Sequence, residues 1–454
     1  MRFVRDDVFW SLAFVVLLGL GTSNNNGHWS MLSFAIVSAG LVVGAIPFVA
    51  ALRRRASAPT SGPLAGNAGG WLLIGLLATM PLTALFDARL LPPAALAHFG
   101  GGRAMQVVTL LLLATYLREN ERLRTARFVT FGVVTFALGV LTIRLSREPD
   151  IDVWTSQQRA TELLLEGKNP YQWVAIPTSD RADDFTVVYN YPPLSIYLAL
   201  LGRVVGGDPR YGCLVAVIAA GIALRVIART GAEEKRPAIV DDAAALSFWL
   251  WSPILFVLDR AWVDPQQVAL LAIAVAAWSR GKNTLAAVVL GVTLTSKQSM
   301  FWLVPLAFVF LRFDTKRWAA LAAGAFLPLL PFVVWDFARL KHNLFDFMAG
   351  LGPRHDALCF TAFVHHAFGA AFPHQIGFLL GAVAVGAAWW RRPASESRAE
   401  NALAFARATA IAYYVFFFFN RWMFANYYCT VVGFAAITAA AAVARDAGAA
   451  KRTS

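Results

Sequence analysis

Apolar runs alternate with short polar segments along almost the whole chain. A helix needs about 20 predominantly apolar residues to cross the hydrocarbon core of a bilayer, and several runs approach that length. The pattern predicts about 14 transmembrane helices, near residues 8–21, 31–52, 70–86, 104–117, 128–145, 211–229, 243–257, 267–279, 284–298, 299–311, 318–335, 376–390, 403–419 and 427–444. We therefore expect an all-α polytopic membrane protein.

Two stretches of the first long polar segment fit helices that lie on the membrane and do not cross it. Residues 153–166 place Ala160 and Leu163 on one side and Gln157 elsewhere, a pattern typical of an amphipathic interfacial helix. Residues 194–205 are apolar but number only about 12, too few to span comfortably. We predict that both stretches belong to an outer loop that follows the fifth span.

The composition agrees with a membrane protein. Of 454 residues, 58% are hydrophobic and 15% are charged, whereas roughly a quarter of the residues of a soluble domain are charged. The net charge of +13 comes from basic clusters between the apolar runs, such as Arg53-Arg54-Arg55 and Arg391-Arg392. The positive-inside rule explains this distribution, so we expect membrane lipids as partners and no nucleic acid. Placing the clusters in the cytoplasm puts both chain ends inside.

In this topology the remaining polar chemistry gathers on the outer face. Residues 146–191 contain eight acidic and four basic side chains, the reverse of the inner loops. A second outer segment, 336–375, is rich in histidine and arginine. Acidic residues at the point where a hydrophobic helix leaves the bilayer are costly unless they bind something or take part in chemistry. This arrangement favours a membrane enzyme whose site lies on the outer side.

Three charged residues stand out first. Asp150 and Asp152 follow the fifth span, where a carboxylate held between a span and an amphipathic helix fits a general base toward a hydroxyl. The alternative is a solvated acid that flanks a helix. Lys297 lies in an apolar stretch, where a lysine pairs with an anionic group such as a phosphate or extends to the lipid headgroups.

Two polar turns add further candidates. The first combines Arg260 with Asp264, and the second contains Arg354 and His355, which suit a clamp for phosphate or sugar. Ordinary polar turns are the alternative for both. The histidines of the second outer segment have no recognisable ligand spacing, so no metal is predicted. The chain has no Walker loop and no dinucleotide fingerprint, so a donor must arrive from the membrane or the outer face.

A series of short motifs lies on this face in a fixed order. They are Ile151-Asp152-Val153-Trp154, Gly167-Lys168-Asn169-Pro170-Tyr171, Tyr191-Pro192-Pro193-Leu194, Gly207-Asp208-Pro209-Arg210-Tyr211, Trp262-Val263-Asp264-Pro265, Ser296-Lys297-Gln298 and Trp335-Asp336. Together they resemble the C-type (GT-C) membrane glycosyltransferases, and more narrowly the family-87 type related to polyprenyl-phosphate-mannose-dependent mannosyltransferases. The resemblance covers residues 128–445, with outer loops 146–210 and 336–375. It leaves residues 1–127 as four additional spans and 446–454 as a cytoplasmic tail.

The resemblance implies an inverting glycosyltransferase of a bacterial-type inner membrane. Its donor would be a polyprenyl-phosphate sugar, carrying mannose or another hexose or pentose, and its acceptor a lipid or glycan on the outer face. The implied base is Asp152 first and Asp150 second. The implied donor-phosphate ligands are Lys297, Arg260 and Arg354, and the implied substrate contacts are Tyr171, Tyr191, Trp154, Asp264, Gln298 and His355. This chemistry requires no cofactor; a divalent metal is compatible with Asp150 and Asp152 but is not indicated.

Other classes of protein fit part of the pattern. A transporter or flippase of a lipid-linked sugar would place polar groups near the midplane and show repeats between its halves, and neither feature is visible here. An oligosaccharide polymerase or ligase would carry its main polar loop later in the chain. A structural or sensing membrane protein without catalysis is the remaining alternative.

Overall fold

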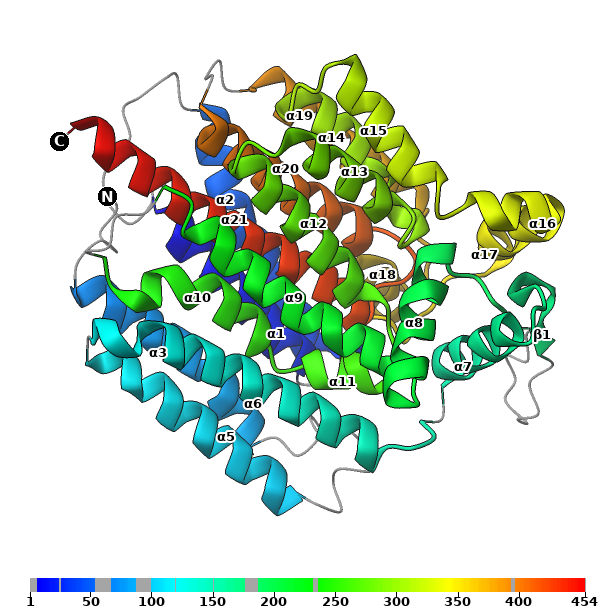
Figure 1. The fold of residues 1–454 in the computed structure, drawn as a ribbon, viewed down its shortest axis with the longest axis horizontal. Helices are drawn as coiled ribbons and strands as arrows, with labels where there is room; N and C mark the ends of the chain where they lie inside the picture. The colour runs from blue at the N-terminus through cyan, green and yellow to red at the C-terminus, as the bar shows by residue number, and fades with distance from the viewer. Residues whose placement is uncertain are drawn as a thin grey trace.

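The computed structural model describes residues 6–23, 26–53, 67–86, 99–118, 120–149, 151–175, 187–231, 236–392 and 397–453. Within these ranges the chain is almost entirely helical, which confirms the predicted all-α architecture (Figure 1). The one sheet among them is a pair of two-residue strands, β1 (Val174–Ala175) and β2 (Val187–Val188), which run antiparallel.

The helices follow one another with short connections. In chain order they are α1 (Asp7–Ser23), α2 (Met31–Arg53), α3 (Asn67–Phe86), α5 (Phe99–Ala114), η4 (Thr115–Leu117), η5 (Glu121–Leu123), α6 (Arg124–Leu145), α7 (Asp152–Leu165), η6 (Pro170–Gln172), α8 (Pro193–Gly206), α9 (Arg210–Ala228), α10 (Ala238–Trp249), α11 (Ile254–Asp259), α12 (Asp264–Ser279), α13 (Asn283–Leu294), η7 (Gln298–Trp302), α14 (Leu303–Phe310), α15 (Thr315–Phe326), α16 (Leu330–Lys341), η8 (His342–Asp346), α17 (Phe347–Gly350), α18 (Phe360–Phe368), α19 (Gln375–Trp390), α20 (Arg398–Phe418) and α21 (Ala425–Thr453).

Several helices meet the length and composition that a membrane span requires. Among the described residues, α2, α6, α9, α20 and α21 are long and apolar enough, and α15 with the segment Leu330–Gly350 makes a sixth candidate bent by 60°. Shorter apolar helices account for most of the other predicted spans. The chain is thus multi-pass by these criteria, and the number of about 14 spans stays a prediction.

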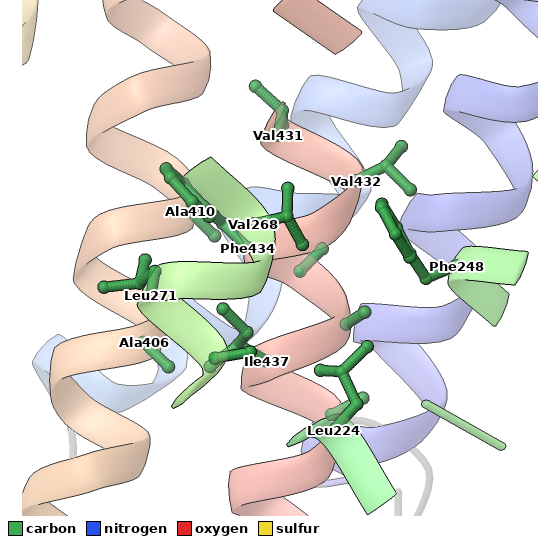
Figure 2. Packing of buried hydrophobic residues seen from close by; sticks show 14 of the residues in the cluster. Leu224, Phe248, Val268, Leu271, Ala406, Ala410, Val431, Val432, Phe434 and Ile437 are labelled. Carbon is green, nitrogen blue, oxygen red and sulfur yellow. The ribbon is translucent and has the colours of Figure 1, made fainter. Parts of the chain in front are cut away.

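The last long helix, α21, forms the centre of the bundle (Figure 2). It packs against α1, α9, α10, α12 and α20, and Val431, Val432, Phe434 and Ile437 of α21 are all buried. A Cβ on Gly433 would come within 2.3 Å of the Val268 side chain on α12. Glycine is therefore required where these two helices approach, as in other close contacts between membrane helices.

The first helices pack into this bundle. Helix α1 packs against α21, α2 packs against α20, and α3 packs against α10. These contacts join the two ends of the chain, because α1 comes from its beginning and α20 and α21 from its end. The predicted division at residue 127 stays a prediction, but the described helices before it share an interface with those after it.

The predicted outer loop forms a subdomain at one end of the molecule, where α7, β1, α8 and α16 lie together (Figure 1). Helix α7 matches the helix predicted at 153–166, and α8 matches the short apolar run at 194–205. A small apolar cluster fixes the subdomain and comprises Ala160, Tyr171, Tyr189, Ile196, Phe332, Leu340 and Leu344.

Two predicted spans differ from the structure. The span predicted at 243–257 is two helices, α10 and α11, because Pro253 lies at the break and a proline disfavours helical geometry in the residue before it. The span predicted at 318–335 is divided between α15 and α16. Helix α16 itself is kinked at Asp336, where the backbone is extended and the second outer segment was predicted to begin.

Candidate functional site

Asp152 is the first residue of α7, in the polar subdomain. Its carboxylate accepts a hydrogen bond from the Val153 N–H at 2.9 Å, and its side chain is exposed. The N-terminus of a helix stabilises a carboxylate. Partial burial by the surrounding protein nevertheless raises the pKa of Asp152 above its usual value, while Val153 and the positive charge of Arg354 act against the rise. Asp152 is thus an accessible carboxylate with an increased affinity for protons.

A buried ion pair lies in the adjoining bundle. Lys297 Nζ lies 2.9 Å from Asp264 Oδ1, and the two side chains are 8% and 1% exposed. The Thr430 hydroxyl donates to the same oxygen at 2.9 Å, and the ring centroid of Tyr427 lies 4.0 Å from Nζ. Lys297 therefore binds an anionic partner, as predicted for a lysine in an apolar stretch. That partner is a second predicted site residue, Asp264.

The charges of Asp152 and of Asp264 both act on Tyr191. It is partly buried, and burial together with the charges of Asp152 and Asp264 raises its pKa well above the usual value, so its hydroxyl stays neutral. Tyr191 is therefore within electrostatic range of both carboxylates. The structure thus brings Asp152, Tyr191, Asp264 and Lys297 into one neighbourhood from four separate segments.

Two other predicted substrate contacts hold the Tyr191 loop in place. Tyr171 is 1% exposed, and its hydroxyl donates to the Tyr191 carbonyl at 2.8 Å. Its ring packs edge-on against Phe332, so it offers no free face to a sugar. The Gln298 amide donates to the Asn190 carbonyl at 2.6 Å. In this conformation both side chains position the loop, and their contact with substrate stays a prediction.

Arg354 and His355 lie in the connection before α18. Arg354 donates two hydrogen bonds to Asp356, at 2.8 and 2.7 Å, and its charge also acts on Asp152. The His355 ring stacks on His365 with centroids 3.5 Å apart, and partial burial followed by the neighbouring histidines lowers the pKa of His355. The structure therefore brings Arg354 toward the proposed base.

Arg260 and Trp154 belong to a second cluster, centred on the buried Arg210. Arg260 Nε lies 3.7 Å from Asp259 Oδ2. Arg210 reaches the same Asp259 at 3.6 Å, and its guanidinium carbon lies 5.9 Å from the centroid of the Trp154 ring. The donor-phosphate role of Arg260 and the sugar contact of Trp154 stay predictions.

Three residues of the site were not predicted. Tyr427 and Thr430 lie three positions apart on the first turns of α21, so they share one face of the helix, and both contact the Lys297–Asp264 pair. Arg421 donates to the carbonyls of Leu351 and Met348 at 2.5 and 2.6 Å. These carbonyls carry no net charge, and no carboxylate among the described residues pairs with Arg421.

Asp150, the second candidate base, lies outside the described residues. Within the part of the chain that the structure describes, no group of three or more histidine, cysteine, aspartate or glutamate side chains has an arrangement that suits a metal ion.

Comparisons with known proteins add a distant structural likeness. No protein-family model matches the chain, and no curated protein matches it. Among solved structures, a crystal structure of ArnT from Cupriavidus metallidurans bound to undecaprenyl phosphate superposes with a TM-score of 0.45 and 16% sequence identity. The match covers 70% of this chain and 60% of that one. Similarity at this level assigns neither a family nor an activity, so the resemblance to C-type glycosyltransferases stays a prediction.

Proposed function

We propose that the protein is an inverting glycosyltransferase of the C type. It transfers a sugar from a polyprenyl-phosphate donor to a hydroxyl of a lipid or glycan on the outer face of a bacterial-type cytoplasmic membrane. The observation that carries the proposal is that two carboxylates act on Tyr191: the accessible Asp152, and Asp264, which holds the buried cation Lys297. The transfer needs a base at the acceptor and a cation at the leaving phosphate.

In the proposed reaction, Asp152 takes the proton of the acceptor hydroxyl while the acceptor oxygen attacks the anomeric carbon of the donor. The new carbon–oxygen bond forms on the face opposite the phosphate. The bond to the phosphate breaks on the other side, and its electron pair leaves with the polyprenyl phosphate. One displacement of this kind inverts the anomeric configuration. The raised pKa of Asp152 suits a general base, because a more basic carboxylate accepts the proton more readily.

Negative charge develops on the departing phosphate, so cations must be in position before the reaction. Lys297 is oriented by Asp264, which also neutralises it. Net positive charge to stabilise the departing phosphate must therefore come from other cations near the Lys297–Asp264 pair. Arg421 is the strongest addition, because it is bonded to carbonyl groups and its charge acts on Tyr427, which covers Lys297. We assign Lys297 and Arg421 to the donor phosphate and Arg354 to the vicinity of Asp152.

The test uses purified protein in nanodiscs, a panel of radiolabelled polyprenyl-phosphate sugars, and a membrane-lipid extract as acceptor. Wild type is compared with Asp152→Asn and with Asp346→Asn, a control that removes an exposed carboxylate of the second outer segment paired with Lys341. We expect transfer by wild type and by the control, and a loss of at least about 100-fold in Asp152→Asn.

The outcomes separate the alternatives. Full activity of Asp152→Asn would exclude Asp152 as the base, and Asp150→Asn is then tested in the same assay. If wild type binds a donor without transferring its sugar, and moves it across a sealed bilayer, the protein is a transporter. Products that lengthen with time would identify a polymerase.

A further inference from the structure

A second feature of the bundle is an apolar groove that lies away from the candidate site. Helices α14, α15 and α19 enclose an apolar groove of about 540 Å³. Val304, Phe308, Trp318 and Trp389 are among its lining residues, and all of its lining side chains are apolar. Phe308 and Trp389 are 62% and 56% exposed, so the groove opens to the surroundings of the bundle. In a membrane these surroundings are lipid chains.

One end of the groove is cationic. A recess of about 380 Å³ shares Phe308 and Trp318 with the groove and adds the exposed side chains of Arg312 and Arg392. The nearby Arg317 is neutralised by Asp314 at 2.7 Å. Within the described part of the chain, no carboxylate pairs with Arg312 or Arg392. The groove therefore combines an apolar channel with two positive charges at its mouth.

The backbone of Arg312 adopts an uncommon conformation. Its φ of 46° lies in the left-handed region, which side chains other than glycine rarely adopt and which costs about 1 kcal/mol or more. Arg312 follows α14, whereas Lys297 precedes η7 at the other end of the same helical segment, Gln298–Phe310. The cationic mouth and the candidate site thus lie at opposite ends of this segment. By the positive-inside distribution, the mouth faces the cytoplasm.

We propose that this groove binds an anionic glycerophospholipid of the cytoplasmic leaflet. One acyl chain lies along Val304 and Phe308, and the phosphate lies between Arg312 and Arg392. Trp318 and Trp389 lie at the level of the headgroup, where tryptophan is enriched in membrane proteins. The lipid bridges α14, α15 and α19. The charges select this occupant, because a zwitterionic lipid gains little from two arginines, whereas anionic headgroups are attracted by clustered basic side chains.

The test is native mass spectrometry of the full chain in detergent, titrated with phosphatidylglycerol and, separately, with phosphatidylcholine. The groove variant is Arg312→Gln with Arg392→Gln. The matched control is Arg280→Gln with Lys282→Gln, which removes two exposed cations from the turn between α12 and α13. We expect wild type and control to retain one phosphatidylglycerol in preference to phosphatidylcholine. In the groove variant the affinity falls by about 30-fold, the effect expected for two surface arginines.

A third variant tests the apolar part of the site. Val304→Trp adds volume to the groove without changing charge, and we expect it to reduce retention of phosphatidylglycerol while leaving Arg312 and Arg392 in place. Equal retention by wild type and the groove variant would overturn the proposal. So would displacement of the lipid by undecaprenyl phosphate at equal concentration, because the groove would then be a donor channel. A doubled protein mass with no lipid would show that a second copy covers the groove.

Discussion

Lys297 and Asp264 form an ion pair at 2.9 Å that joins segments 33 residues apart in the sequence. Asp264 begins α12, and Lys297 lies between α13 and η7. Thr430 of α21 bonds to the same carboxylate oxygen, and the Tyr427 ring lies over the ammonium. The pair therefore fixes three parts of the bundle relative to one another at the candidate site.

Removing one partner of this pair is expected to destabilise the protein strongly. Lys297→Met or Asp264→Leu leaves a buried charge without compensation, which typically costs about 3–5 kcal/mol. The double variant Lys297→Met/Asp264→Leu buries no charge, so we expect it to recover most of that loss. Thermal unfolding of the purified variants in detergent measures the effect.

The same variants separate stability from function. We expect the double variant to fold and to lack transfer activity, because it has lost the cation proposed for the donor phosphate. If the double variant folds and has wild-type activity, Lys297 does not bind the donor phosphate. The pair would then have a structural role only.

The pH dependence of transfer tests the contact between Arg354 and Asp152. The base acts as a carboxylate, and its pKa is raised, so activity is lost on acidification at a pH above that of an ordinary aspartate. The charge of Arg354 lowers this pKa. Arg354→Gln therefore moves the acidic limb of the kcat/KM profile to higher pH and leaves the rate at neutral pH comparatively unchanged.

The control for this shift must account for Asp356, which loses its partner in Arg354→Gln. The variant Arg354→Gln/Asp356→Asn removes both charges, so a shift that persists in it comes from the missing arginine. Arg339→Gln, which removes an exposed cation of α16, is expected to leave the profile in place. If the acidic limb moves in neither variant that lacks Arg354, the charge of Arg354 does not act on the pKa of the base.

Two helices of the subdomain, α7 and α8, could be predicted from the sequence. Helix α7 follows from the 3.6-residue periodicity of residues 153–166, and Asp152 begins it because it comes directly before that pattern. Lys297 was recognisable because a lysine in an apolar stretch needs an anionic partner. These inferences depend on local sequence, and periodicity and isolated charges are local signals.

The contacts of the site could not be predicted in the same way. Thr430 reaches Asp264 across 166 residues, and no local pattern encodes that pairing. Tyr427 follows Arg421 in an aromatic stretch that is also typical of a membrane interface. Tyr171 lies in a polar segment and was expected to contact substrate, but packing of α7 and α16 buries it, and its contact with substrate stays a prediction. Packing between segments that are far apart in the sequence determines the contacts of all three residues.

Arg210 is expected to be essential for the fold of the polar end of the bundle, where α9 begins. It is fully buried, bonds to Asp208 at 2.8 Å and to the Ser146 carbonyl at 2.6 Å, and lies 3.6 Å from Asp259. Arg210→Met takes the buried cation away from the partly buried Asp208 and leaves the buried Asp259 with Arg260 alone, so we expect a loss of about 3–5 kcal/mol, seen as a lower melting temperature. Arg203→Met breaks a more exposed ion pair with Glu162 and serves as the control, with an expected cost of about 1 kcal/mol or less. Equal melting temperatures for both variants would contradict this assignment.

We expect the aromatic ring of Tyr427, and not its hydroxyl, to stabilise the ammonium of Lys297. Tyr427→Phe keeps the ring over the ammonium, so we expect transfer within about threefold of wild type. Tyr427→Ala loses an interaction of about 0.5–2 kcal/mol and opens the pair to water, so we expect a loss of about 10-fold in kcat/KM. Steady-state kinetics with a varied donor concentration measures both variants, and their melting temperatures show whether the fold is intact. If Tyr427→Phe loses as much activity as Tyr427→Ala, the hydroxyl is the functional group and the ring only carries it.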